Sequence, residues 1–292
     1  MDGGRLCTER TPRVVAARKL HRRVARERAG RFLAEGVRAV EAALAAATGP
    51  TGEAFGGRTP VRVFEVFATP AAAERNPGAL AAAHAAGVGV SMITERAAAA
   101  LSETVTPRGL LAVCGLLDVP LAAALSGAPK LVAVLVGTSD PGNAGTVIRV
   151  ADAAGADAVV LAGDAVDPHN GKCVRASAGS LFHLSVATER NVSAVLAGCR
   201  EAGLRLLAAT AAGERDLHDP AAALALAEPC AWLFGNEAHG LSDQVAAAAD
   251  ARVRVPIYGR AESLNLATAS AVCMYATACL QRGATISPDA AR

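Results

Sequence analysis

The second half of the chain alternates short, charge-free apolar segments with segments of helical composition. The first apolar segment, residues 131–137 (LVAVLVG), carries no charged side chain. A strand of this kind is typical of a parallel sheet whose two faces are both covered by helices. Further apolar segments follow at 158–162, 181–186, 204–210 and 231–235. The alternation predicts an α/β domain with a mainly parallel sheet.

The first half of the chain predicts a smaller α/β module. Its expected strands are 31–36, 61–68 and 110–116, and its expected helices are 13–29, 36–47, 70–86 and 94–101. A Gly-rich stretch at 48–60 is predicted to be a loop. With 292 residues the chain is long enough for two domains. We therefore divide it into an N-terminal domain (1–117), a linker with two prolines (118–130) and a C-terminal domain (131–284).

Composition excludes several classes of protein. Apolar residues make up 52% of the chain, yet no run is long enough to span a membrane, and no signal-peptide pattern opens it. The seven cysteines form no CxxC pair and no Cys/His group with zinc spacing. We therefore expect a cytoplasmic protein without a metal site and without membrane association.

Positive charge is concentrated near the N-terminus. Residues 5–31, here called the basic arm, hold ten Lys and Arg against two Glu, on a chain whose formal net charge is only +2. Such a concentration is typical of proteins that bind the phosphates of nucleic acids. The alternative is a solvated basic helix with no partner.

Three polar segments follow apolar strands of the C-terminal domain. They are residues 143–149 (NAGTVIR), 233–240 (LFGNEAHG) and 255–266 (VPIYGRAESLNL). In an open α/β sheet, ligands bind where strands end, because the loops there are free of the core. The three segments together span more than a hundred residues of chain, but the fold can bring them to one site.

Each segment can also be explained without a catalytic or ligand-binding role. Arg149 could face a phosphate or a reacting hydroxyl, or be a surface cation, and Asn143 could be only a helix cap. Glu237 could accept a hydrogen bond from a ligand amine or a ribose hydroxyl, or belong to an ordinary turn. Ser263 is expected to cap a final helix over 263–281. Asn265, in the first turn of this helix, could bind a purine edge, a backbone group or a neighbouring loop.

Common nucleotide and hydrolase motifs do not occur. No GxGxxG follows the strand at 131–137, and the chain contains no GxxxxGK[ST] and no GxSxG. A dinucleotide-binding Rossmann site, a P-loop nucleotidase and an α/β-hydrolase are therefore unsupported. The final helix is apolar on most faces, which predicts burial in the core or in a subunit interface.

The three segments, in this order and spacing, resemble the three motifs of the SpoU/TrmH family of RNA ribose 2′-O-methyltransferases, in the SPOUT superfamily. The resemblance extends over about residues 131–281 and includes 172–183 (KCVRASAGSLFH). Residues 10–115 are similar to the family's small substrate-binding domain, which itself resembles an RNA-binding ribosomal protein.

The resemblance implies a deep trefoil knot, a pocket for S-adenosylmethionine and a homodimer with its active site between subunits. Matching the motifs residue by residue implies catalytic roles for Asn143, Arg149, Glu237, Ser263 and Asn265. It implies cofactor binding, mainly through the backbone, by Thr210, Gly235, Asn236, Gly240, Val255, Ile257, Leu264 and Leu266. Arg149 would activate the ribose hydroxyl, although an arginine is an unusual base because its pKa is so high.

The expected function is methyl transfer from S-adenosylmethionine to a ribose 2′-hydroxyl. The partner is RNA, with ribosomal RNA slightly favoured over transfer RNA, and neither DNA nor a membrane is expected. Two alternatives remain: a non-catalytic RNA-binding or ribosome-assembly factor that retains the fold, and a methyltransferase of the same superfamily that modifies a base. A methylase that protects the ribosome from an antibiotic is a variant of the first reading.

Overall fold

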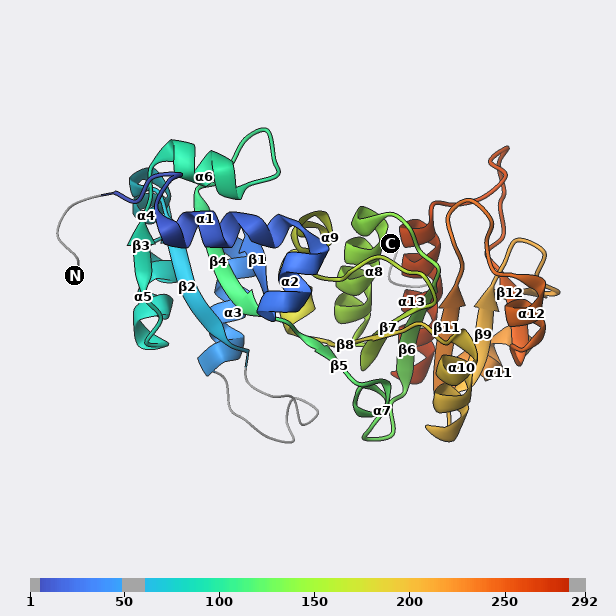
Figure 1. The fold of residues 1–292 in the computed structure, drawn as a ribbon. Coiled ribbons are helices and arrows are strands. Elements are labelled where there is room, and N and C mark those ends of the chain that lie inside the picture. The colour runs from blue at the N-terminus through green and yellow to red at the C-terminus, as the bar shows by residue number, and fades with distance from the viewer. Residues whose placement is uncertain (1–5, 49–60, 284–292) are drawn as a thin grey trace, which may run out of the picture. The chain divides into compact units, whose positions relative to one another are not determined.

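The computed structural model describes residues 6–48 and 61–283, so Arg5 of the basic arm and nearly all of the expected loop at 48–60 lie outside it. Contacts within the chain divide it into two units (Figure 1). Unit 1 contains the described residues up to Asp118 together with Asp167–His183. Unit 2 contains Val119–Val166 and the described residues from Leu184 onward. The division differs from the contiguous one expected, because a segment of the second half packs with the first.

Unit 1 is built on a four-stranded sheet with the order β1-β4-β2-β3. The strands are β1 (Arg31–Glu35), β2 (Val63–Ala68), β3 (Val90–Met92) and β4 (Leu110–Gly115). β4 pairs antiparallel with both β1 and β2, whereas β2 and β3 are parallel. The sequence pattern predicted β1, β2 and β4 but not β3, whose three residues are too few to show a period.

Short helices surround this sheet. They are α1 (Pro12–Arg18), the 3₁₀ turn η1 (Lys19–His21), α2 (Arg23–Ala29), α3 (Val37–Thr48), α4 (Pro70–Arg75), α5 (Pro77–Ala85), α6 (Glu95–Leu101), α9 (Gly171–Ser177) and the 3₁₀ turn η3 (Ser180–Phe182). The single helix expected over 13–29 is wrong, because η1 and an extended Arg22 interrupt it. The carbonyl oxygens of Leu20 and His21, at this break, accept hydrogen bonds from Arg26 Nη1 at 2.9 and 2.8 Å.

Arg26 is a buried part of unit 1, although it belongs to the basic arm. Only 3% of the residue is exposed. Its guanidinium donates to Asp167 Oδ2 from Nε at 2.9 Å and from Nη2 at 2.6 Å. The Asp167 Oδ1 atom lies 3.3 Å from His169 Nδ1, while His169 Nε2 accepts a hydrogen bond from the Leu117 amide at 2.9 Å. These bonds attach the start of the 167–183 segment to unit 1.

The other end of this segment is held by packing. The rings of Phe182 and Phe32 stack with centroids 6.0 Å apart, and Phe182 is almost fully buried. The strand expected at 181–186 is therefore displaced: its first residues form η3 in unit 1, and the strand β8 is Ser185–Glu189. Leu181 and Phe182 are apolar like the residues of a buried strand, but they pack in the core of unit 1 and not in that of the parallel sheet.

Unit 2 contains an eight-stranded sheet with the order β10-β12-β9-β11-β6-β7-β8-β5. The strands are β5 (Asp118–Val119), β6 (Leu131–Val136), β7 (Ala158–Ala162), β8, β9 (Arg205–Ala209), β10 (Arg215–Asp216), β11 (Cys230–Phe234) and β12 (Ala251–Arg254). The neighbouring strands from β10 to β8 all pair in parallel. The prediction of an α/β fold with a parallel sheet is confirmed.

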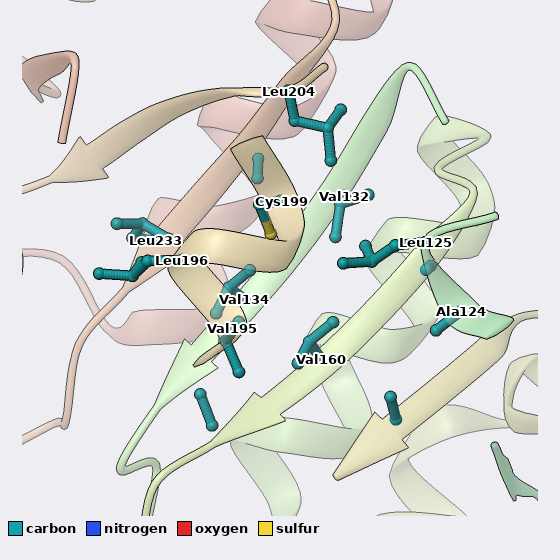
Figure 2. Packing of buried hydrophobic residues seen from close by; sticks show 14 of the residues in the cluster. Ala124, Leu125, Val132, Val134, Val160, Val195, Leu196, Cys199, Leu204 and Leu233 are labelled. Atoms are coloured by element: carbon teal, nitrogen blue, oxygen red, sulfur yellow. The ribbon is translucent and has the colours of Figure 1, made fainter. Parts of the chain in front are cut away.

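Helices cover this sheet: α7 (Leu121–Ala124), α8 (Pro141–Ala154), α10 (Val192–Glu201), α11 (Pro220–Ala227), α12 (Asp243–Ala247) and α13 (Leu266–Gln281). Figure 2 shows one face, where Val195 and Cys199 of α10 lie near Val132 of β6 and Val160 of β7. Small residues such as these allow the helices to pack closely on the strands.

On α13, the buried Thr277 hydroxyl accepts a hydrogen bond from the indole of Trp232 on β11 at 2.9 Å. This bond fixes the last helix to the sheet, and α13 also packs beside α8. The helix begins at Leu266 and not at 263 as expected. Within the described residues, no helix is long and apolar enough to cross a membrane.

The strand order changes direction next to β6. From β6 the chain adds β7 and β8 on one side, then crosses to the other side, where β11 lies between β9 and β6. The loops that leave the carboxyl ends of the neighbouring strands β6 and β11 both lie at this point. Such switch points are where open α/β sheets form crevices for ligands.

Candidate functional site

A pocket of about 620 Å³ lies at this switch point in unit 2. It is lined by residues that directly follow β9, β11 and β12 and by the chain that leads into α13. Of the predicted site residues, all except Arg149 line it: Asn143, Thr210, Gly235, Asn236, Glu237, Gly240, Val255, Ile257, Ser263, Leu264, Asn265 and Leu266. The fold thus brings the three polar segments to one place.

Glu237 connects the loop after β11 to the loop after β6. Its Oε2 accepts hydrogen bonds from the Ser139 amide at 3.1 Å and the Ser139 hydroxyl at 3.2 Å. Its Oε1 accepts from the Asp140 amide at 3.2 Å and from Asn143 Nδ2 at 3.0 Å. One carboxylate therefore holds the turn that starts α8. Glu237 is a hydrogen-bond acceptor, and its donors here are groups of the protein itself.

These bonds also set the charge of Glu237. Burial raises its pKa, but the hydrogen bond from Asn143 and those from the backbone amides outweigh this, so the pKa lies below its ordinary value. A carboxylate with a lowered pKa gives its stabilising contribution above the ordinary pKa of about 4.3 and loses it as the pH falls further. Glu237 is therefore ionised throughout the neutral range.

Replacing Glu237 by glutamine is expected to lower kcat roughly 10-fold, as measured by methyl transfer. The new amide group would face N–H donors of Ser139, Asp140 or Asn143, so that one of these donors loses its acceptor. Because wild-type Glu237 stays ionised, the profile of kcat against pH should keep its shape between about pH 5.5 and 9. The exposed Glu201 on α10, changed in the same way, is the control. Equal activity of the two variants would contradict the positioning role of Glu237.

Asn143 and Asn265 join the network to the last helix. Asn265 Nδ2 donates to Asn143 Oδ1 at 3.1 Å. The Asn265 side chain also caps α13, because its Oδ1 accepts from the Ala267 amide at 2.9 Å. The prediction that Ser263 caps this helix is wrong: Ser263 lies three residues before the first helical position, lines the pocket and is exposed. Asn143 is not a cap either, since Asp140 caps α8.

The loop from Gly235 to Gly240 is closed on itself. Asn236 and Gly240 exchange two backbone hydrogen bonds of 3.1 and 2.8 Å, and Asn236 Nδ2 donates to the Gly137 carbonyl at 2.6 Å. A Cβ on Gly235 would lie 2.2 Å from the Gly240 carbonyl carbon, which no structure tolerates. Only glycine at 235 therefore allows this compact wall of the pocket.

Arg149 is placed differently from the other predicted residues. It is exposed on α8, does not line the pocket and makes no hydrogen bond or ion pair with any residue that the structure describes. It follows Asn143 by six residues, which corresponds to about 9 Å along a helix and to another face. Asn143 points to Glu237, so the two side chains of this motif leave α8 in different directions.

Sequence reasoning missed several residues of the site. Ser139 and Asp140 bind Glu237, and Ala211, Ala212 and Val253 line the pocket. Ala211 and Ala212, which follow β9, carry no polar group to single them out. The nearby Gly213 was a signal of a close approach, because a Cβ there would lie 2.7 Å from the Val253 carbonyl carbon.

The pocket fits a nucleoside-like cofactor. Its volume is within the usual range for small-molecule sites, and its walls combine alanine, leucine, valine and isoleucine side chains with polar ones. The polar lining residues are Asn143, Thr210, Asn236, Glu237, His239, Glu262, Ser263 and Asn265. A pocket with apolar and polar walls suits S-adenosylmethionine, whose purine is flat and whose ribose and amino-acid parts are polar.

Two family profiles match the chain. The SpoU rRNA Methylase family matches residues 130–275, and the MRM3-like substrate binding domain matches residues 11–112. The first match covers the sheet from β6 onward with the pocket, and the second covers most of the smaller sheet of unit 1.

Named relatives agree with these profiles. The chain is 33% identical, over 88% of its length and 92% of the relative's, to "23S rRNA (guanosine(2553)-2'-O)-methyltransferase RlmP" of Bacillus subtilis. It resembles the AdoMet-bound rRNA methyltransferase from Sinorhizobium meliloti with a TM-score of 0.75 and 28% identity, over 94% of this chain and 97% of that one. For the AdoMet complex of the SpoU methyltransferase AviRb from Streptomyces viridochromogenes the TM-score is 0.76 with 26% identity, over 93% and 99%. The chain belongs to the SpoU rRNA methylase family.

Proposed function

We propose that the protein transfers a methyl group from S-adenosylmethionine to a ribose 2′-hydroxyl of 23S ribosomal RNA. The observation that supports this most is that one pocket at the switch point is lined by residues from all three polar segments. A relative matched over 88% of the chain is named for this reaction, and structures similar to this chain are described with AdoMet bound.

In this proposal Thr210, Gly235, Val255 and Leu264, with their neighbours, hold the cofactor in the pocket, largely by backbone groups. When bound, S-adenosylmethionine supplies an electrophilic methyl group on a positively charged sulfur. The chain's own contribution is positioning: the hydroxyl oxygen has to approach that methyl in line. The closed loop 235–240 and the Glu237 network fix the walls against which both reactants are placed.

The 2′-hydroxyl is a poor nucleophile and needs help with its proton. Arg149 is our candidate for orienting this hydroxyl and a neighbouring phosphate, because a guanidinium binds phosphate oxygens in pairs. Its high pKa makes it a weak candidate for accepting the proton. Asn143, Ser263 and Asn265, at the edge of the pocket, are the groups available to orient the ribose.

We further propose a homodimer in which Arg149 of one protomer completes the pocket of its partner. Arg149 is exposed outside the pocket of its own chain. On α13, which packs beside α8, Tyr275 and Leu280 are 48% and 42% exposed. Exposed apolar groups on one helix and an exposed, unpaired cation on the helix packed against it suit an interface in which the cation enters the neighbouring site.

The reaction is also placed in the cytoplasm in this proposal. Five of the seven cysteines are buried, and none of them forms a disulfide in the part of the chain that the structure describes. Burial raises the pKa of the Cys199 thiol to about 11 and that of Cys273 to about 12. Such thiols are unreactive apolar groups and suit a reducing compartment in which ribosomes are assembled.

The test is methyl transfer from labelled S-adenosylmethionine to unmodified 23S rRNA, with 16S rRNA and transfer RNA as parallel substrates. The RNA is then digested to nucleosides. A labelled 2′-O-methylnucleoside from 23S rRNA alone is the expected result. Label in a base would make the protein a base methyltransferase. No label in any RNA, with the cofactor bound, would favour the non-catalytic RNA-binding factor.

A further inference from the structure

A second pocket, within unit 1, is lined by basic side chains. Its volume is about 910 Å³. Arg38 at the start of α3, Arg75 at the end of α4, Arg108 before β4 and Arg175 on α9 line it. Among its described lining residues the one acid is Glu35, so the lining carries a formal charge of +3. We call these lining residues the arginine pocket.

Glu35 neutralises only one of the four arginines. It is 8% exposed, and it accepts hydrogen bonds from Ser102 Oγ at 2.5 Å and from Arg175 Nη1 at 3.2 Å. Arg175 also lies 3.6 Å from Glu103 Oε2. Arg175 is thus held in place by two carboxylates, and these contacts give it a structural role in unit 1.

The other three arginines have no such role. Arg38, Arg75 and Arg108 are exposed, and none of them makes a hydrogen bond or an ion pair with a residue in the described parts of the chain. Three like charges around one cavity repel one another, and this repulsion falls when an anion enters. Nothing in the packing of unit 1 requires these three side chains, so a ligand is the simplest reason for their arrangement.

The chemistry of the lining indicates which anion. Guanidinium groups bind phosphate oxygens in pairs, and the first turn of α3 adds backbone N–H groups that favour an anion. Among the described lining residues none is aromatic, so the pocket offers no ring on which a base could stack. A cavity of this size lined by four arginines suits several phosphates of a chain better than one small anion.

We propose that Arg38, Arg75 and Arg108 bind consecutive phosphates of the RNA substrate, independent of its sequence. The proposal rests on the function proposed above, since it takes the RNA from that reaction. In this proposal the sequence-independent affinity for RNA comes from the arginine pocket. The distribution of charge along the sequence had indicated the basic arm instead. Within the arm, Arg26 is buried, while Arg13 and Arg23 pair with Glu65 and Glu27.

The experiment measures binding of the full chain to an unmodified 23S rRNA transcript over a series of salt concentrations. The variant changes Arg38, Arg75 and Arg108 to alanine together. Each lost phosphate contact lowers the slope of log K against log salt by about 0.7 to 0.9, so we expect a slope smaller by about 2 to 3. Affinity at moderate salt should fall at least about 10-fold. Cofactor binding and Tm should stay at wild-type values, because the three side chains are exposed and unpaired.

A control variant removes the same charge elsewhere: Arg96, Lys130 and Arg190, all exposed, are changed to alanine. Its salt slope should remain that of the wild type. A slope that is unchanged in the arginine-pocket variant, or reduced equally in the control, would overturn the proposal. The binding assay does not depend on turnover. If the wild-type protein binds RNA through the three arginines but transfers no methyl group, the proposed function fails while this inference stands.

Discussion

Changing Arg149 to alanine is expected to lower kcat by about 100- to 1,000-fold, the usual cost of removing one fixed charge that acts in the transition state. The affinity for S-adenosylmethionine should be unchanged, because the proposal gives Arg149 contacts with the ribose hydroxyl and a phosphate of the RNA and none with the cofactor. Calorimetry gives the cofactor affinity, and methyl transfer to 23S rRNA gives kcat. An Arg149→Lys variant keeps the charge but loses the planar fork, so it should recover only part of the rate. The exposed Arg190, changed to alanine, is the control.

A mixed dimer decides whether Arg149 acts across the interface. One protomer carries Arg149→Ala and the other Glu237→Ala, each with its own affinity tag. If Arg149 enters the partner's pocket, one of the two sites has both residues intact, and the mixed dimer should show about half of the wild-type rate. If Arg149 acts within its own chain, both sites are defective and the rate stays at the level of the single variants. Full activity of Arg149→Ala itself would remove the catalytic role altogether.

Changing Arg26 to alanine is expected to destabilise unit 1 by about 3 kcal/mol, because it leaves the Asp167 carboxylate buried without its partner. For a chain of this size the loss corresponds to a fall in Tm of about 6 to 12 °C. Arg28 lies on the same helix and is exposed, so Arg28→Ala should leave Tm within about 1 °C. Thermal unfolding followed by circular dichroism measures both. Equal Tm values for the two variants would show that the buried pair contributes nothing.

The destabilisation should also depend on pH. Burial raises the pKa of Asp167, but hydrogen bonds from His169 and Arg26 outweigh this and hold it well below its usual range. With a lowered pKa in the folded state, the contribution is complete above the ordinary aspartate value of about 3.9 and is lost as the pH falls below it. The difference between wild type and Arg26→Ala should therefore be constant from about pH 5 to 8 and shrink in acid.

The sequence was sufficient to predict the pocket but not the details of its hydrogen bonds. Strand ends are visible as changes from apolar to polar residues, so the three polar segments followed from the pattern, whereas Gly235, Val255 and Thr210 were assigned to the cofactor by the family resemblance. The pattern did not show which donors each carboxylate oxygen binds, because Ser139 and Asp140 become partners of Glu237 only when the loops of β6 and β11 meet. The start of α13 was misplaced since both Ser263 and Asn265 are good helix caps.

The predictions failed where tertiary context replaced local pattern. Leu181 and Phe182 look like the start of a strand, but their burial is in the core around Phe32. The buried Arg26 looks like a solvent-facing cation of a basic segment, and only its distant partner Asp167 explains it. The trefoil knot stays a prediction from the family resemblance, because nothing in composition or periodicity specifies how loops thread.

The return of residues 167–183 to unit 1 has a consequence for how the protein is made. A ribosome adds about 5 to 20 residues per second, so this segment emerges several seconds after β4 has left the exit tunnel. Until then Arg26 and Glu35 lack Asp167 and Arg175. Unit 1 of a nascent chain would therefore wait, incompletely packed, for a segment that follows about 50 residues later in the chain. A fragment cut after residue 118 would remain in that state, so a fragment that contains unit 1 has to extend at least to His183.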